Sequence, residues 1–143
     1  MKKRILVLGG SRQAVTGLEQ LKALGLDVVV CDFDPNAPGF RLADHTILAS
    51  VYHIDDCLPA VVEFHKKHPL DGVMCLACDV PHIVARIASS LGLPGLPHDV
   101  ADRAVNKMEM KRKFEEDGVS IPRYWATADV ASLENILSGD FPD

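Results

Sequence analysis

The chain has 143 residues, 48% of them hydrophobic, which suffices for one well-buried core and falls short of two full domains. Its formal net charge of −5 and isoelectric point near 5.6 exclude the overall positive electrostatic potential with which proteins bind nucleic acid or anionic membranes. The apolar run after residues 2–4 stops at Gly9, too early for a signal peptide, and the four cysteines lack the spacing of a secreted disulfide framework. We therefore expect a reduced, cytoplasmic protein with no nucleic-acid partner and no membrane partner.

Short apolar runs alternate with amphipathic helical patterns along most of the chain. Asp55 or Asp56 is the expected N-cap of one helix and Asp79 that of another, while Gly25 and Gly92 are expected helix stops. In chain order, the sequence predicts a strand at 4–8, a helix at 12–24, a strand at 26–31, a helical turn at 41–43, a strand at 46–49, a helix at 55–67, a strand at 72–76 and a helix at 80–91.

This alternation predicts βαβ units, whose right-handed crossovers build a parallel sheet. The expected fold class of residues 1–103 is therefore α/β, a Rossmann-like parallel sheet with helices on both faces. The composition changes within residues 94–105, where prolines and a glycine mark a domain boundary. Residues 104–143 are expected to form a short helix–strand–helix appendage, with Asn106 as the cap of its first helix and Gly118 as its stop.

The glycine-rich loop after the first strand is the first candidate site. In an open parallel sheet, ligands bind beyond the carboxyl ends of the strands, which is where Gly9, Gly10, Ser11 and Arg12 lie. Glycines permit close backbone approach, and a helix N-terminus presents unpaired N–H groups, so these four are candidate substrate-binding residues. The alternative is a tight turn that needs glycine for its geometry alone.

Asp32 ends the second strand, where a dinucleotide-binding fold places an acidic group on a ribose hydroxyl. Alone it suggests NAD, but the loop before it lacks the G-x-G-x-x-G spacing of the pyrophosphate site. Asp32 is therefore a candidate substrate-binding residue. Asp32 and Asp34 could equally be solvated loop carboxylates.

Cys78 and Asp79 follow the fourth strand and are candidate substrate-binding residues at the same edge. Cys75 and Cys78 form a C-x-x-C pair, but Cys75 is expected in the buried strand and no second pair stands at zinc spacing. The six histidines are scattered, so no metal site is predicted. The sequence contains no P-loop and no G-x-S-x-G elbow.

Several stretches, taken in order, resemble the ATP-grasp ligases, and within them the biotin carboxylase, carbamoyl phosphate synthase and purine-ribonucleotide carboxylase group. They are KRILVLGG at 3–10, VVVCDFDPNAP at 28–38, LAD at 42–44, and LGLPG at 91–95 followed by Asn-Lys at 106–107, Gly118 and Ile-Pro at 121–122. Each stretch is common, and the ordered combination carries the resemblance. It implies that residues 1–103 are a pre-ATP-grasp domain and residues 104–143 the beginning of an ATP-grasp domain.

The resemblance also implies one nucleotide contact. Lys107 matches the family lysine that contacts ATP phosphates, a role that suits a compact point charge. The preceding residue is Asn106, where the family has Asp. Without the resemblance, Lys107 is a solvated cation on a helix in which Glu109 and Lys113 pair at i, i+4. The family's other lysine strand, phosphate loop and magnesium ligands do not occur in residues 1–143, so no catalytic residue and no metal ligand is assigned.

The expected protein is thus the N-terminal fragment of an ATP- and Mg²⁺-dependent ligase, inactive alone, that stops at residues 140–143, about where the lysine-bearing strand should begin. Such ligases activate a carboxylate or bicarbonate as an acyl phosphate and then form a C–N or C–C bond. The expected partners are this small-molecule substrate and the C-terminal ATP-grasp domain, and a homodimer stays open. Two alternatives stay open as well: an NAD(P)-binding domain that uses Asp32, and a small-molecule-binding domain without catalysis.

Overall fold

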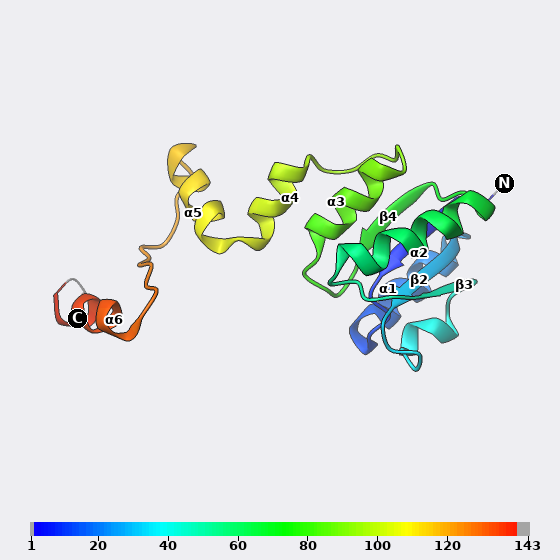
Figure 1. Ribbon diagram of the computed structural model, residues 1–143, viewed down its shortest axis with the longest axis horizontal. Helices are drawn as coiled ribbons and strands as arrows, with labels where there is room; N and C mark the ends of the chain where they lie inside the picture. The colour runs from blue at the N-terminus through cyan, green and yellow to red at the C-terminus, as the bar shows by residue number, and fades with distance from the viewer. Residues whose placement is uncertain (1, 140–143) are drawn as a thin grey trace. The chain divides into compact units, whose positions relative to one another are not determined.

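The computed structural model describes residues 2–139, so the expectation for residues 140–143 lies outside the described part. The chain forms two compact units, Met1–Val105 and Asn106–Asp143, which are described separately below. Figure 1 labels most of the helices and strands of both units.

The described part of the first unit contains a four-stranded parallel sheet in the order β3-β2-β1-β4. The inner residues of the two central strands, at 5–8 and 28–31, are all apolar because helices cover them from both sides. In register, Leu6 of β1 lies opposite Val29 on one side and Val73 on the other. The strands are β1 (Arg4–Leu8), β2 (Asp27–Asp32), β3 (His45–Leu48) and β4 (Gly72–Cys75).

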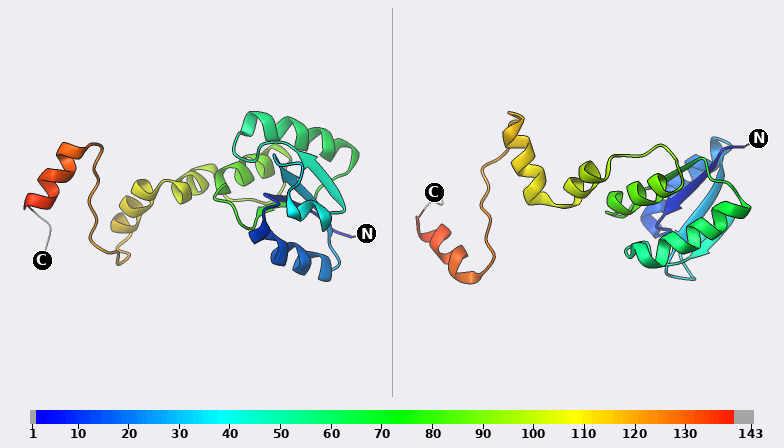
Figure 2. Two further views of the ribbon diagram at one scale, coloured as in Figure 1. Left: turned by 90° about the horizontal axis from the view of Figure 1, so that it is seen from below. Right: turned by 45° about the horizontal axis from the view of Figure 1, so that its top comes forward.

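Helices cover the two faces of the sheet, as Figure 2 shows in its left view. On one face, α1 packs its Leu18 against Val7 and Val28. On the other face, α2 and α3 pack Val61 and Ile87 into a second cluster. The helices of this unit are η1 (Arg12–Ala14), α1 (Val15–Ala23), η2 (Pro38–Arg41), α2 (Ile54–Lys67), α3 (Pro81–Ser90) and α4 (His98–Val105). The predicted α/β sheet with helices on both faces is confirmed.

Three local predictions need correction. The helical turn expected at 41–43 lies at Pro38–Arg41, because Pro38 with its fixed φ begins the turn. The N-cap of α2 is His53, so Asp55 and Asp56 lie within the first turn, where carboxylates favour the positive end of the helix dipole. The N-cap of α3 is Val80 instead of Asp79. The predicted stops at Gly25 and Gly92 are confirmed by their positive φ values.

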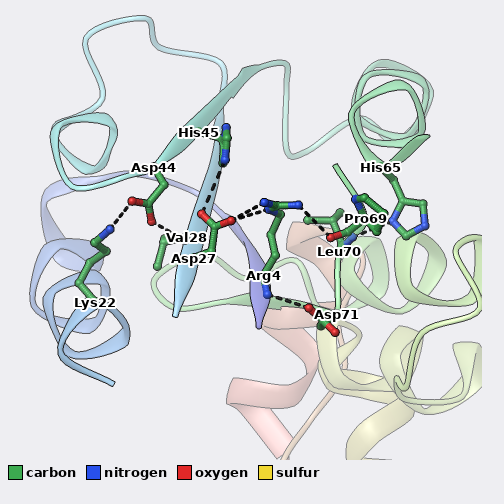
Figure 3. A network of polar contacts seen from close by, with 10 residues as sticks. All are labelled: Arg4, Lys22, Asp27, Val28, Asp44, His45, His65, Pro69, Leu70 and Asp71. Carbon is green, nitrogen blue, oxygen red and sulfur yellow. Dashed lines mark hydrogen bonds and ion pairs between the residues drawn. The ribbon is translucent and has the colours of Figure 1, made fainter. Parts of the chain in front are cut away.

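A polar network ties together the amino ends of the strands (Figure 3). Arg4 of β1 donates from its Nε to Asp27 of β2 at 2.7 Å, and its backbone N–H donates to Asp71 before β4 at 2.8 Å. Asp44, before β3, accepts the backbone N–H of Val28 at 2.8 Å. Each edge of the sheet is therefore anchored to a central strand by a carboxylate.

The described part of the second unit contains α5 (Lys107–Glu116) and α6 (Val130–Gly139), with no strand between them. The predicted strand of the appendage is thus not formed. Asn106 caps α5 as predicted, accepting the backbone N–H groups of Met108 at 3.1 Å and Glu109 at 3.2 Å. Gly118 ends the helix with a φ of 69°.

The charged surface of α5 is paired differently from the prediction. Glu109 forms an ion pair with Arg112, and Lys113 donates to Asp117 at 2.6 Å. The expected pair between Glu109 and Lys113 is therefore wrong, because each partner has a competing charge within one turn. None of the helices in the described part of the chain combines the length and the apolarity that a bilayer crossing requires.

Candidate functional site at the carboxyl ends of the strands

The glycine loop leaves β1 through a turn that requires glycine. Gly9 has a φ of 85°, which side chains other than glycine rarely adopt. Its N–H donates to the backbone oxygen of Cys31 at 2.8 Å, so the loop is bonded to the end of β2.

Gly10 is held by a buried carboxylate. The Gly10 N–H donates to Asp32 Oδ2 at 2.6 Å, and the Asp34 N–H donates to Asp32 Oδ1 at 2.9 Å. Asp32 is only 7% exposed. Each oxygen of this carboxylate therefore already accepts a backbone N–H, and Asp32 fixes the conformation of two loops.

A second glycine closes this arrangement from the other side. The Gly39 N–H donates to the oxygen of Gly10 at 2.7 Å. A Cβ atom on Gly39 would lie 2.8 Å from the Gly10 Cα, and one on Gly10 would lie 2.9 Å from Val30 Cγ1. A side chain at Gly39 would therefore collide with the Gly10 backbone, and one at Gly10 would collide with the Val30 side chain.

A small cavity of about 160 Å³ lies above these loops. Its wall includes Gly9 and Ser11 from the first loop, Asp32 and Asp34 from the second, and Cys78 after β4. Two exposed aromatic side chains also line it: Phe33, which is 60% exposed, and Tyr52, which is 56% exposed. The carboxyl ends of β1, β2 and β4 therefore contribute to one pocket.

Cys78 enters this wall as a neutral hydrogen-bond donor. Its thiol donates to the backbone oxygen of Leu8 at 3.1 Å. A hydrogen bond with Cys75 raises the pKa of the Cys78 thiol, and burial raises it further. The hydrogen bond to Leu8 and the raised pKa both favour the protonated thiol of Cys78.

The sequence predicted part of this pocket. Four predicted residues line it together: Gly9, Ser11, Asp32 and Cys78. Three predicted residues are not among its lining: Gly10, which lies beneath it against Val30, and Arg12 and Asp79, which are exposed.

Sequence reasoning missed the aromatic wall of the pocket. Phe33 follows β2 directly and could have been found by the strand-end rule that selected Asp32. Tyr52 lies four residues beyond β3, and no signal in the sequence placed it near Phe33.

A larger cavity of about 470 Å³ lies at the opposite, amino edge of the sheet. Four of its five charged lining residues are paired with one another, since Lys3 bonds to Asp71 at 2.8 Å and Arg4 to Asp27, and the fifth is Lys2. We assign it a structural role, because parallel sheets bind ligands at the carboxyl edge. Among residues 2–139, no group of three or more His, Cys, Asp or Glu side chains is placed to hold a metal ion.

Lys107 belongs to the second unit and is its first helical residue. Its side chain is exposed, so its ammonium group is accessible from solvent. No described residue forms an ion pair with it, whereas Lys113 on the same helix is paired.

Comparison with known protein families assigns this fold to one of them. The model of the ATP-grasp N-terminal domain matches residues 18–95, more than half of the chain. The chain therefore belongs to the ATP-grasp N-terminal domain family, as its sequence motifs indicated. Lys107 and the glycine loop lie outside the matched residues.

Solved structures agree with this assignment. Phosphoribosylglycinamide synthetase from Anaerococcus prevotii is 26% identical over 96% of this chain and 35% of its own, with a TM-score of 0.72. N5-carboxyaminoimidazole ribonucleotide synthetase from Thermotoga maritima is 19% identical over 98% of this chain and 37% of its own, with a TM-score of 0.73. The Staphylococcus aureus N5-carboxyaminoimidazole synthetase complexed with ADP is 15% identical over 96% of this chain and 36% of its own, with a TM-score of 0.71. No curated protein matches the chain in sequence.

The last two structures, at these low identities, establish the fold alone. The chain spans about a third of the length of the solved structures it matches.

Proposed function

We propose that the chain is the amino-terminal part of an ATP-dependent ligase that activates a carboxylate or bicarbonate as an acyl phosphate for attack by a nucleophile. The observation that carries this proposal is the match of 96% of the chain to a synthetase at 26% identity, beside the match to the family model. In this proposal, residues 1–103 form the pre-ATP-grasp domain and residues 104–143 begin the ATP-grasp domain.

The carboxyl-edge pocket is the proposed contribution of the first domain to substrate binding. It lies where ligands of open parallel sheets bind, and its floor is fixed by hydrogen bonds of Asp32 and Gly39. A cavity of about 160 Å³ is smaller than the roughly 300–1,000 Å³ of complete ligand sites. The pocket is therefore proposed to hold one part of a substrate, with the rest bound elsewhere in the protein.

Lys107 is the proposed ATP contact of this chain. Its exposed ammonium group can neutralise phosphate charge, and the Asn106 cap fixes the helix start from which the side chain extends. The described residues lack a cluster of carboxylates suited to Mg²⁺. We propose that magnesium ligands and catalytic groups come from other parts of the protein, and that residues 1–143 alone do not turn over ATP.

The glycine loop weighs against the NAD(P) alternative, because it lacks the G-x-G-x-x-G spacing of a pyrophosphate site. Each Asp32 oxygen accepts one backbone N–H, which leaves only part of its accepting capacity for a ribose hydroxyl. The glycine loop also directs the N–H groups of Gly9 and Gly10 to protein acceptors.

The test uses the protein at its full encoded length with ATP, Mg²⁺ and a panel of carboxylates and bicarbonate. Hydroxylamine traps an acyl phosphate as a hydroxamate, which is measured together with ADP. Carboxylate-dependent formation of both products is expected. If no carboxylate stimulates either product, the ligase proposal is wrong.

Lys107→Ala tests the nucleotide contact in the same assay. A hydrogen bond to a charged group contributes roughly 1.5–3 kcal/mol, so KM for ATP should rise by about ten- to a hundredfold. Lys113→Ala is the matched control, because it removes the same charge from the same helix at a lysine already paired with Asp117. Equal effects of the two substitutions would refute the role of Lys107.

A further inference from the structure

The carboxyl-edge pocket has an electrostatic character that distinguishes between ligands. Its charged lining residues in the described part of the chain are Asp32 and Asp34, both acidic. Arg12, the nearest basic residue in sequence, is exposed and does not line the pocket. A phosphate or carboxylate entering here would meet two like charges without a compensating cation.

Three backbone donors in the loops beneath the pocket are also occupied. The N–H of Gly9 donates to Cys31 at 2.8 Å, that of Gly10 to Asp32 at 2.6 Å, and that of Asp34 to Asp32 at 2.9 Å. Phosphate-binding glycine loops depend on such N–H groups being free to face the anion. This loop uses glycine for its turn and for its contact with Gly39.

The rim of the pocket carries two aromatic rings from different loops. Phe33 follows β2 and Tyr52 follows β3, and more than half of each side chain is exposed. Exposed aromatic rings beside carboxylates are a typical environment for organic cations, which are attracted to the ring faces and to the negative charge. A strongly hydrated anion gains nothing from the rings.

We propose that this pocket binds the protonated amino group of an amine-bearing substrate and excludes phosphate and carboxylate groups. Asp34 and the partly accessible Asp32 provide the negative charge, and Phe33 and Tyr52 provide the aromatic walls. This inference rests on the proposed function, since it assigns the pocket to the amine-bearing part of a ligase substrate. The activated carboxylate would then bind outside this pocket.

The experiment is an NMR titration of the ¹⁵N-labelled 143-residue chain at constant ionic strength and pH 7. The probes are benzylammonium, benzyl alcohol and benzoate, which share a ring and differ in charge. Benzylammonium is expected to shift the amides of Ser11, Phe33 and Tyr52 saturably. Benzyl alcohol and benzoate should bind at least about tenfold more weakly.

Three variants test where the probe binds. Asp34→Asn should weaken benzylammonium binding severalfold, because Asp34 is exposed and removing its charge leaves the Asp32 contacts intact. Glu19→Gln, on the exposed side of α1, removes one charge outside the pocket and should leave the affinity unchanged. Phe33→Ala should weaken binding of benzylammonium as well.

Several outcomes would overturn the proposal: benzoate or inorganic phosphate binding as tightly as benzylammonium, equal binding of benzyl alcohol, Mg²⁺ shifting the same amides, or no saturable shift with any probe. The titration needs no ATP, so its failure leaves the ligase proposal standing. Absence of ATP turnover in the full-length protein would in turn leave a measured ammonium preference intact.

Discussion

Replacing Asp32 by alanine should destabilise the first unit far more than its position in a loop would indicate. The carboxylate is 7% exposed and accepts the backbone N–H groups of Gly10 and Asp34 at 2.6 and 2.9 Å. Asp32→Ala leaves both donors without a partner at the end of the two central strands.

The magnitude follows from these two contacts. A buried donor left unpaired costs about 1–3 kcal/mol, which applies to the Gly10 N–H, and loss of the hydrogen bond of the partly buried Asp34 N–H costs about 0.5–1.5 kcal/mol more. Relief of the repulsion between Asp32 and Asp34 offsets part of this loss, which gives an expected destabilisation of about 1–4 kcal/mol. With an m-value near 2 kcal/mol/M, the urea midpoint should fall by about 0.5–2 M.

The assay is urea unfolding followed by far-UV circular dichroism and by the amide signals of β1. Asp34→Ala is the matched control, because Asp34 is exposed and accepts one backbone N–H, that of Asn36 at 2.8 Å. The control should cost less than about 1 kcal/mol. If Asp32→Ala is no more destabilising than Asp34→Ala at an unchanged m-value, the structural role of Asp32 is refuted.

Three further predictions concern other contacts. Gly10→Ala places a Cβ atom 2.9 Å from Val30 Cγ1 and should cost about 1–3 kcal/mol in urea unfolding; an unchanged midpoint would contradict the close packing. Asn106→Ala should lower the helicity of α5, measured by Cα chemical shifts, through loss of a cap that contributes about 1 kcal/mol, whereas Asn106→Asp should keep it. Hydrogen bonding by Lys3 holds the pKa of Asp71 below its ordinary value of 3.8, so its stabilisation is present above that value and is lost as the pH falls through the lowered folded-state pKa. Asp71→Asn should therefore destabilise the protein at pH 7, and the effect should shrink as the pH falls through the folded-state pKa of Asp71; a difference that stays constant as the pH falls would argue against the ion pair.

The parallel sheet could be predicted because its signal is local. A run such as Ile5–Leu8 with glycines behind it is typical of a buried strand, and the structure places β1 at Arg4–Leu8. Helix starts were less predictable, since Asp55 and Asp79 are good caps by residue type while the actual caps are His53 and Val80. Neither His53 nor Val80 caps its helix through a side-chain hydrogen bond, so residue type alone could not locate these starts.

The sequence predicted where the pocket lies but not its internal contacts or its aromatic lining. The strand-end rule selected Gly9, Asp32 and Cys78 correctly as neighbours. It could not predict that Asp32 bonds back to the glycine loop, because that contact joins residues 22 positions apart and depends on the sheet register. For the same reason, the sequence could not predict that Phe33 and Tyr52 line the same pocket.

The contact between Gly10 and Gly39 has a consequence for how this site can diversify. Because the two backbones and the Asp32 carboxylate form the floor of the pocket, no ligand is needed to order it. A rigid floor reduces the entropy lost on binding. It also means that the residues that stabilise the fold differ from those that select the ligand. Evolution or engineering can therefore exchange the exposed rim residues Phe33, Asp34 and Tyr52 to change the ligand while the floor, and with it the fold, stays the same.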